Sequence, residues 1–156
     1  MTKHWIRVAS KCLAESLEPI PHELNELDWK AALSDGKGRL VEHLIAFANN
    51  PNGGFLVFGI RDIDAELVGI TQGEVTDVVN TLVNLGRDAI EPALALDHAV
   101  IDHLGVSLLL VHIPEQRNKP AHKRGKSIEE AWIRSGGTTR KASRQEVGGL
   151  MLNSQA

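Results

Sequence analysis

The sequence has little of what several large classes of protein require. Its 156 residues include a single cysteine, Cys12, which excludes an internal disulfide and a zinc site made of several cysteines. Tyrosine is absent and aromatic residues make up 4% of the chain, so a row of exposed rings for stacking single-stranded bases is not expected. No apolar run approaches the ~20 residues of a membrane-spanning helix.

The first residues also lack the apolar core of a signal peptide. His4 and Trp5 lead directly into an amphipathic segment. Together with the single cysteine, which suits a reducing compartment, this favours a cytoplasmic protein without a membrane partner. With 42% hydrophobic and 24% charged residues, the chain has the composition of a globular domain.

Charged residues are unevenly distributed along the chain, whose net charge is -3. Residues 117–144 contain nine Lys and Arg against two Glu, whereas residues 1–116 contain eight Lys and Arg against seventeen Asp and Glu. A basic segment of this kind has two interpretations: an edge that faces a polyanion, or a solvated loop without a partner. Charge alone does not separate them.

Hydrophobic spacing predicts an α+β or mixed α/β domain, in which a mixed β-sheet is flanked by helices. We expect residues 1–20 to form an N-terminal helix that packs with a single domain over residues 21–156. Helices are predicted over residues 4–17, 39–49, 71–91 and 143–152. Strands are predicted over residues 24–31, 55–60, 65–70, 94–101, 106–113 and 131–134, with a basic loop over 114–127.

One turn carries more turn-forming residues than a simple connection needs. The stretch AFANNPNGGFLVFGIRD, residues 46–62, runs from a predicted helix through Asn49, Gly53 and Gly54 into a short apolar strand. Asparagine and glycine tolerate positive φ, and paired glycines let another group approach the backbone closely. We interpret the turn as a device that seats the helix on a central strand and presents Asp62 at the end of that strand. We expect the basic segment to fold back beside this turn as one electropositive groove.

A second charged group precedes the turn. On the predicted strand 24–31, the side chains of Glu26, Asp28 and Lys30 point to one face. Carboxylates that converge on one point bind Mg²⁺ or Mn²⁺, because hard cations prefer oxygen ligands. The same pattern is more common on the solvated face of a half-buried strand, and spacing alone favours that interpretation.

Taken together, these segments resemble one family. Glu23-x4-Asp28-Trp29-Lys30 is followed by the stretch at 46–62 and then by Trp132-Ile133-Arg134-Ser135-Gly136. The order resembles the Schlafen-type AlbA-like domain, described as DNA-binding and found in bacterial transcriptional regulators and RecG-helicase-related proteins. The resemblance covers residues 23 to about 150. Departures from the family pattern are Asp28-Trp29 for Glu-Phe, Trp132 for tyrosine, Gly137 for serine, and the extra Pro51 and Asn52.

The resemblance implies a domain that binds nucleic acid, either DNA or RNA. Basic and hydroxyl side chains of the late segment, together with a lysine of the first strand, are the expected phosphate contacts. These residues are Lys30, Lys119, Lys123, Arg124, Arg134, Ser135, Thr138, Arg140 and Lys141.

Two alternatives stay open. Ribonucleases of the Schlafen type use three carboxylates with Mg²⁺ or Mn²⁺, and the resemblance carries this site over to Glu23, Asp28 and Asp62. The other alternative is a nucleotide-binding regulatory domain that takes ATP, although Gly125-Lys126-Ser127 lacks the first glycine of a P-loop because Pro120 stands there. A binding domain needs no cofactor. Because the Schlafen core carries two such lobes in one chain, the resemblance also implies a homodimer.

Overall fold

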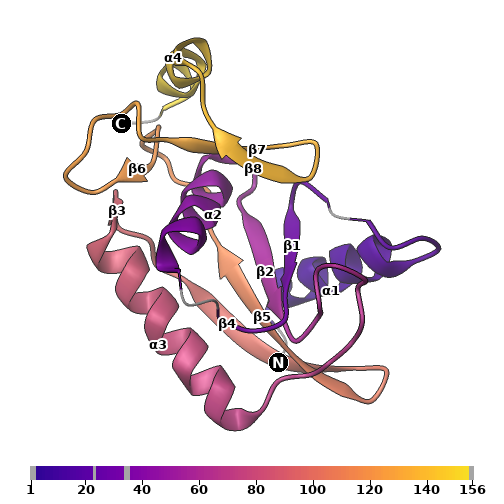
Figure 1. Ribbon diagram of the computed structural model, residues 1–156. Helices are drawn as coiled ribbons and strands as arrows, with labels where there is room; N and C mark the ends of the chain where they lie inside the picture. The colour runs from indigo at the N-terminus through magenta and orange to yellow at the C-terminus, as the bar shows by residue number, and fades with distance from the viewer. Residues whose placement is uncertain (1–2, 23, 34–35, 155–156) are drawn as a thin grey trace.

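The computed structural model describes residues 3–22, 24–33 and 36–154 (Figure 1). Its strands are β1 (Leu27–Lys30), β2 (Gly54–Phe58), β3 (Ile90–Glu91), β4 (Asp97–His103), β5 (Val106–Ile113), β6 (His122–Lys123), β7 (Trp132–Ser135) and β8 (Thr138–Lys141). The central sheet has the order β1-β2-β5-β4, with β1 parallel to β2 and the other neighbours antiparallel. Two small ladders, β3-β6 and β7-β8, complete the strands of the described residues. The mixed α/β fold is confirmed.

Helices cover both faces of the sheet. They are α1 (His4–Leu17), α2 (Lys37–Asn49), α3 (Gln72–Asp88) and α4 (Arg144–Leu152). In Figure 1, α2 and α3 lie on one side of the sheet and α1 lies on the other. Thr71 and Ser143 each form a capping box with the glutamate three residues later, which satisfies orphan N–H groups at the start of α3 and α4. No helix formed by the described residues is both long and apolar enough to span a membrane.

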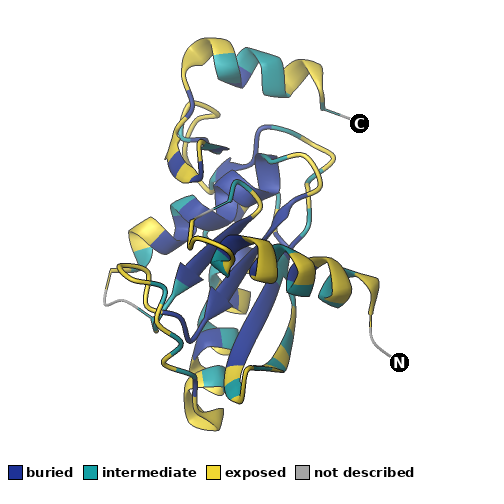
Figure 2. Ribbon diagram, turned by 90° about the vertical axis from the view of Figure 1, so that its right-hand side faces the viewer, coloured by how far each residue is buried: buried dark blue, intermediate teal, exposed yellow. Residues whose placement is uncertain are grey.

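The strand β2 supplies core to both layers. Leu56 and Phe58 pack toward α2 and α3, whereas Phe55 and Val57 pack toward α1. All five of its residues are buried, and Figure 2 shows the central strands as the most buried part of the molecule. The apolar run in the sequence is therefore continuous because the strand is covered on both faces.

Three strand predictions differ from the structure. Residues 65–70 form no strand and make only the bridge between Ile60 and Leu67, because Ala65 and Gly69 have positive φ and interrupt an extended backbone. The basic loop 114–127 contains the short strand β6, which pairs with β3. Because β3 begins at Ile90, the helix α3 ends at Asp88, earlier than the predicted end at residue 91. The strand β8 carries no sequence signal, because Thr-Thr-Arg-Lys has no apolar alternation.

The prediction of a half-buried β1 is wrong. Asp28, expected on a solvated face, is only 4% exposed, and Leu27 and Trp29 on the other face are buried as well. The helix α2 and the β7-β8 hairpin cover the face of Asp28, since its carboxylate lies 3.5 Å from Nδ1 of His43. A strand that is covered on both faces by later segments loses the solvated side that its alternation predicts.

The turn between α2 and β2 is as tight as its sequence predicts. Gly53 has φ of +72°, and a Cβ there would overlap the carbonyl oxygen of Ile113 on the neighbouring strand. A Cβ on Gly54 would overlap the ring of Phe47, which fills the space between helix and strand. The glycine pair therefore allows the helix to sit directly against the sheet.

We predict that Gly54→Ala lowers the free energy of unfolding by about 1–3 kcal/mol, because the added methyl group forces the buried Phe47 ring to move. Urea denaturation followed by circular dichroism measures this change. The matched control is Gly73→Ala in the first turn of α3, where a Cβ meets nothing within 4 Å. Equal stability of the two variants would contradict the close packing described for this turn.

Candidate functional site

The end of α2 holds the late basic segment against the turn. The side chain of Asn49 donates to the carbonyl oxygens of Ala121 (3.1 Å) and Trp132 (3.0 Å) and accepts from the amide of Ala121 at 2.7 Å. A backbone bond from Gln116 to Ala48 (2.9 Å) adds to this contact. The expectation that the basic segment folds back beside the asparagine–glycine turn is confirmed by these bonds.

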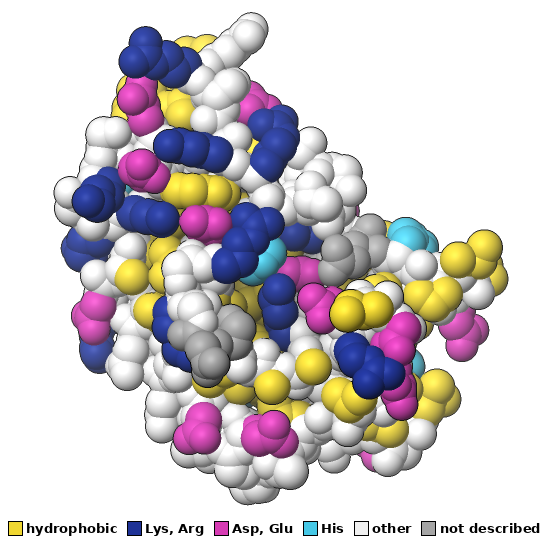
Figure 3. Space-filling model, in the orientation of Figure 1, with side chains coloured by type: hydrophobic (Ala, Val, Ile, Leu, Met, Phe, Trp, Pro, Cys, Tyr) yellow, Lys and Arg dark blue, Asp and Glu magenta, His cyan; other side chains and the backbone are white. Residues whose placement is uncertain are grey.

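Cations from four separate segments gather beside α2. They form what we call the basic strip: Lys30 of β1, Arg39 of α2, Lys123 of β6 and Lys141 of β8. Lys123 and Lys141 both lie over the ring of Trp132, with Nζ at 4.5 and 5.8 Å from the ring centroid. Figure 3 shows Lys and Arg side chains concentrated on the upper half of this face, interleaved with Asp and Glu. The strip is a row of alternating charge and not the uniformly electropositive groove that the sequence predicts.

Acidic side chains within the row explain the interleaving. Glu42 pairs with Arg39 at 3.1 Å and with Lys123 at 3.5 Å, and Glu130 pairs with Lys141 at 3.5 Å. The side chains of Arg39 and Lys141 are 52% and 55% exposed, whereas those of Lys123 and Lys30 are 31% and 24% exposed. Exposed ion pairs contribute little to stability, so Arg39 and Lys141 can exchange a carboxylate for another anion at low cost.

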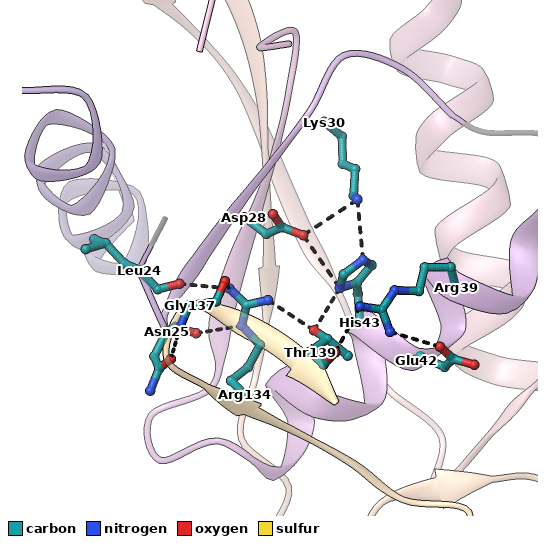
Figure 4. Close-up of polar contacts among 10 residues, drawn as sticks. All are labelled: Leu24, Asn25, Asp28, Lys30, Arg39, Glu42, His43, Arg134, Gly137 and Thr139. Carbon is teal, nitrogen blue, oxygen red and sulfur yellow. Dashed lines mark hydrogen bonds and ion pairs between the residues drawn. The ribbon is translucent and has the colours of Figure 1, made fainter. Parts of the chain in front are cut away.

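A buried polar cluster lies directly under one end of the strip (Figure 4). Oδ2 of Asp28 is 3.7 Å from Nζ of Lys30 and 3.5 Å from Nδ1 of His43. His43 also contacts Oγ1 of Thr139 at 2.8 Å and Nζ of Lys30 at 3.3 Å. The cluster joins the central sheet, α2 and the β7-β8 hairpin through side chains that are far apart in sequence.

The neighbours of His43 determine its protonation. An ammonium group only donates, so Nε2 facing Lys30 is an acceptor, and the ring proton is on Nδ1, from which it is donated toward Thr139 or Asp28. Burial, followed by the charge of Lys30, lowers the pKa of His43 to about 4, although Asp28 opposes the shift. His43 is therefore neutral near pH 7 and holds Lys30 at the edge of the strip.

Arg134 occupies the other side of this cluster. Its guanidinium donates to the carbonyl oxygens of Leu24 (2.8 Å) and Asn25 (3.0 Å), and to Oγ1 of Thr139 at 3.0 Å. It also donates to the carbonyl oxygen of Gly137 at 3.2 Å, and the residue is 6% exposed. These bonds give Arg134 the role of tying the β7-β8 hairpin to the segment before β1.

Comparison with known proteins identifies the family. The model of the Schlafen AlbA_2 family matches residues 23–143, which include the turn, the buried cluster and the strip but not α1. This chain belongs to the Schlafen AlbA_2 family. No curated protein sequence matches it.

Two solved structures have the same fold. The solution structure of the N-terminal domain of a RecG-related protein of Nitrosomonas europaea is 26% identical, with a TM-score of 0.58, and the alignment covers 86% of this chain and 93% of that one. The crystal structure of the DIP2311 protein of Corynebacterium diphtheriae is 18% identical, with a TM-score of 0.60 over 97% of this chain. This chain corresponds to 29% of the Corynebacterium chain.

The other predicted phosphate contacts of this AlbA_2 domain lie outside the strip and are mostly paired. Lys119 pairs with Glu115, Arg124 with Glu91 at 3.6 Å, and Arg140 with Glu146 at 2.6 Å. The hydroxyl of Thr138 donates to the carbonyl oxygen of Ser135 at 2.9 Å, which closes the β7-β8 hairpin. A phosphate contact by any of these residues stays a prediction.

The carboxylates implied by the ribonuclease members lie in different environments. Glu23 is outside the described residues. Asp28 is buried against Lys30 and His43. Asp62 is exposed in the turn after β2; the β2 residue that pairs with Asp28 is Leu56, six residues earlier in the chain. Within residues 3–22, 24–33 and 36–154, no group of three His, Cys, Asp or Glu side chains is arranged to hold a metal ion. The two described carboxylates therefore do not by themselves form the metal site, which stays a prediction that depends on Glu23.

Sequence analysis missed Arg39, Glu42 and His43. A signal for His43 is present, because it lies on the same helical face as Leu40 and Phe47, where an apolar residue is expected. A histidine at a core position of an amphipathic helix needs buried polar partners, and Asp28 is the nearest acidic candidate in the preceding strand.

We predict that Arg134→Gln lowers the free energy of unfolding by ~2 kcal/mol or more, because it leaves buried carbonyl oxygens without donors. Guanidinium denaturation measures the loss. The matched control, Arg140→Gln on the adjacent strand, removes an exposed cation and is expected to change stability little. Loss of nucleic-acid binding by Arg134→Gln without loss of stability would instead make Arg134 a direct contact.

We predict that stability declines as the pH falls from 6.5 to 4, partly through His43. Its pKa in the folded protein, about 4, is below the 6.5 of the unfolded chain, so the unfolded state binds the proton first. The contribution is complete above pH 6.5 and is lost toward pH 4, with a size on the order of 3 kcal/mol. Urea titrations at both pH values should show a smaller decline for His43→Gln than for the wild type and for the exposed control His4→Gln. An identical decline in all three proteins would contradict the shift.

Proposed function

We propose that this chain is a nucleic-acid-binding domain that contacts phosphates with the basic strip. The observation that carries the proposal is the gathering of Lys30, Arg39, Lys123 and Lys141, from four separate segments, along one row in which Arg39 and Lys141 are exposed and the two other lysines partly so. Phosphates recur along a nucleic-acid backbone, and a row of cations on rigid elements matches such a ligand better than a single pocket does. The Nitrosomonas protein is named as related to an ATP-dependent DNA helicase, which agrees with this ligand class.

The lysines above Trp132 are the centre of the proposed interface. The indole is 7% exposed, so its face serves as a fixed support that attracts both ammonium groups. Lysines held in this way lose less conformational freedom on binding than lysines on a mobile loop. Their partners Glu42 and Glu130 repel an incoming polyanion. Binding therefore requires phosphate contacts to replace the partly buried Lys123–Glu42 pair and the more exposed Lys141–Glu130 pair.

The proposed contacts are to the backbone and not to the bases. Trp132 is covered by the two lysines, and Phe58, which lies beside Lys30 and Arg39, is buried, so neither ring offers a platform for stacking on single-stranded bases. The interface is therefore expected to accept DNA or RNA with little sequence preference. A cytoplasmic location, where both polymers are available in a bacterial-type cell, belongs to the same proposal.

We predict that Lys123→Gln with Lys141→Gln weakens the binding of duplex DNA and RNA several-fold at 0.1 M salt. The slope of log K against log salt should fall by about 0.7–0.9 for each phosphate that the variant no longer neutralises. Fluorescence anisotropy over a series of salt concentrations measures both quantities. The control pair is Arg7→Gln with Lys11→Gln on α1, which removes the same charge from the opposite side of the sheet.

Equal weakening by the two pairs would show a nonspecific effect of net charge and would overturn the proposed interface. Repeating the assay with Mn²⁺ and labelled RNA tests the ribonuclease alternative, for which Asp62→Asn should abolish cleavage. Competition by ATP at a fixed salt concentration tests the nucleotide-binding alternative.

A further inference from the structure

The strand β4 forms an open edge of the central sheet. It is the last strand in the order β1-β2-β5-β4, and β5 is its only strand neighbour among the described residues (Figure 1). With seven residues it is among the longer strands, and His98, Val100 and Asp102 on one face are exposed, Val100 by 53%. An open edge of this length is a template for another strand.

The backbone groups that face outward belong to these same three residues. In β5, the carbonyl oxygen of Ser107 accepts from the amide of Ile70 at 3.0 Å, on the side away from β4. Ser107 is opposite Asp102, so the N–H and C=O of Asp102 point to the open edge. Alternation along the strand then directs the groups of Val100 and His98 outward as well. The outward N–H of His98 donates to a carboxylate oxygen of the adjacent Asp97, at 2.9 Å.

The sequence of this edge is complementary to itself. It reads Asp97-His98-Ala99-Val100-Ile101-Asp102-His103. When two copies pair antiparallel about Val100, His98 lies opposite Asp102 of the other copy, and Asp97 lies opposite His103. The carboxylate of Asp102 then meets the imidazole of His98, and the two Val100 side chains meet at the centre. Asp97 already accepts from Nζ of Lys3 and Nε1 of Trp5, both at 2.8 Å, so the pair that carries the complementarity is His98 with Asp102. Opposite cross-strand pairs of this kind stabilise a ladder, whereas like charges destabilise it.

Among the neighbouring registers, only the one centred on Val100 places acids opposite histidines and keeps the faces of the two sheets aligned. Centring the pair on Ala99 or Ile101 keeps the faces aligned but separates the carboxylates from the histidines. Shifting by one residue brings His98 opposite His103 and turns one copy's core face to the wrong side. The Val100-centred register also opposes all three residues whose backbone groups point outward.

We propose that the β4 edge is a dimerisation surface that joins two copies of this chain, antiparallel and two-fold symmetric about Val100, so that their four-stranded sheets become one continuous sheet. The interface is isologous, so the same residues serve both copies and the assembly closes at two. On the second face, Ile101, which is partly buried beside the α1 layer, lies opposite Ala99 of the other copy and extends the apolar contact. The surface shares no residue with the basic strip, so the dimer does not rest on nucleic-acid binding.

A disulfide-trapping experiment tests the register. In a Cys12→Ala background, Val100→Cys brings two thiols together at the axis, where opposite Cα atoms of a hydrogen-bonded pair are ~5.5 Å apart, within the range of a disulfide. The control is Val68→Cys, a valine of similar exposure (47%) in the segment that bonds to β5 on the side away from β4. We expect a disulfide-linked dimer for Val100→Cys after mild oxidation and at least tenfold less for Val68→Cys. Equal trapping of the two variants, or none, would overturn the proposal.

Charge exchange tests the complementarity without cysteines. His98→Asp brings an acid opposite Asp102 at two symmetric positions and is expected to weaken dimerisation at least tenfold in sedimentation velocity. Adding Asp102→His to that variant restores an acid–histidine pair at both positions and should recover association. A wild-type chain that stays monomeric at every concentration, or a double variant that fails to recover while remaining folded by circular dichroism, would contradict the interface.

Discussion

The carboxamide of Asn49 is the interaction on which the arrangement of this domain depends most. It lies at the last position of α2, buried, and its three hydrogen bonds join two later segments, at Ala121 and Trp132, to the central turn. An amide can donate and accept at once, which neither aspartate nor leucine of similar size does. The positions of β6 and β7, and therefore of Lys123 and the Trp132 ring, follow from this one side chain.

A second group of polar contacts also holds the late segment against the central sheet and α2. Asp28, His43 and Arg134 join β1, α2 and the β7-β8 hairpin, and each is buried and held by polar neighbours. Such a network is favourable only when all members are satisfied, and no buried side-chain nitrogen or oxygen of the described residues lacks a partner. The basic strip is thus built on a network of satisfied polar groups, whereas the side chains of Arg39 and Lys141 remain exposed and can exchange partners.

The two proposed surfaces follow from different features of the chain. The strip depends on tertiary contacts among segments up to about a hundred residues apart, such as Arg39 with Thr139. The β4 edge depends on a local pattern of seven residues, together with its position at the end of the sheet. One surface lies beside α2 and the other at the β4 edge of the sheet, so the two proposals can be tested independently.

Local patterns determined the elements whose signals are strong: the apolar run of β2, the capping boxes at Thr71 and Ser143, and the glycines of the turn. Each follows from the physics of a few adjacent residues. Tertiary structure decided the rest. Asp28 carries an ordinary surface pattern, and it is buried only because α2 and β8 cover it. Likewise, the basic segment specifies its charge, but which cations stay exposed depends on acids brought in from α2, because pairing acts through space and not along the chain.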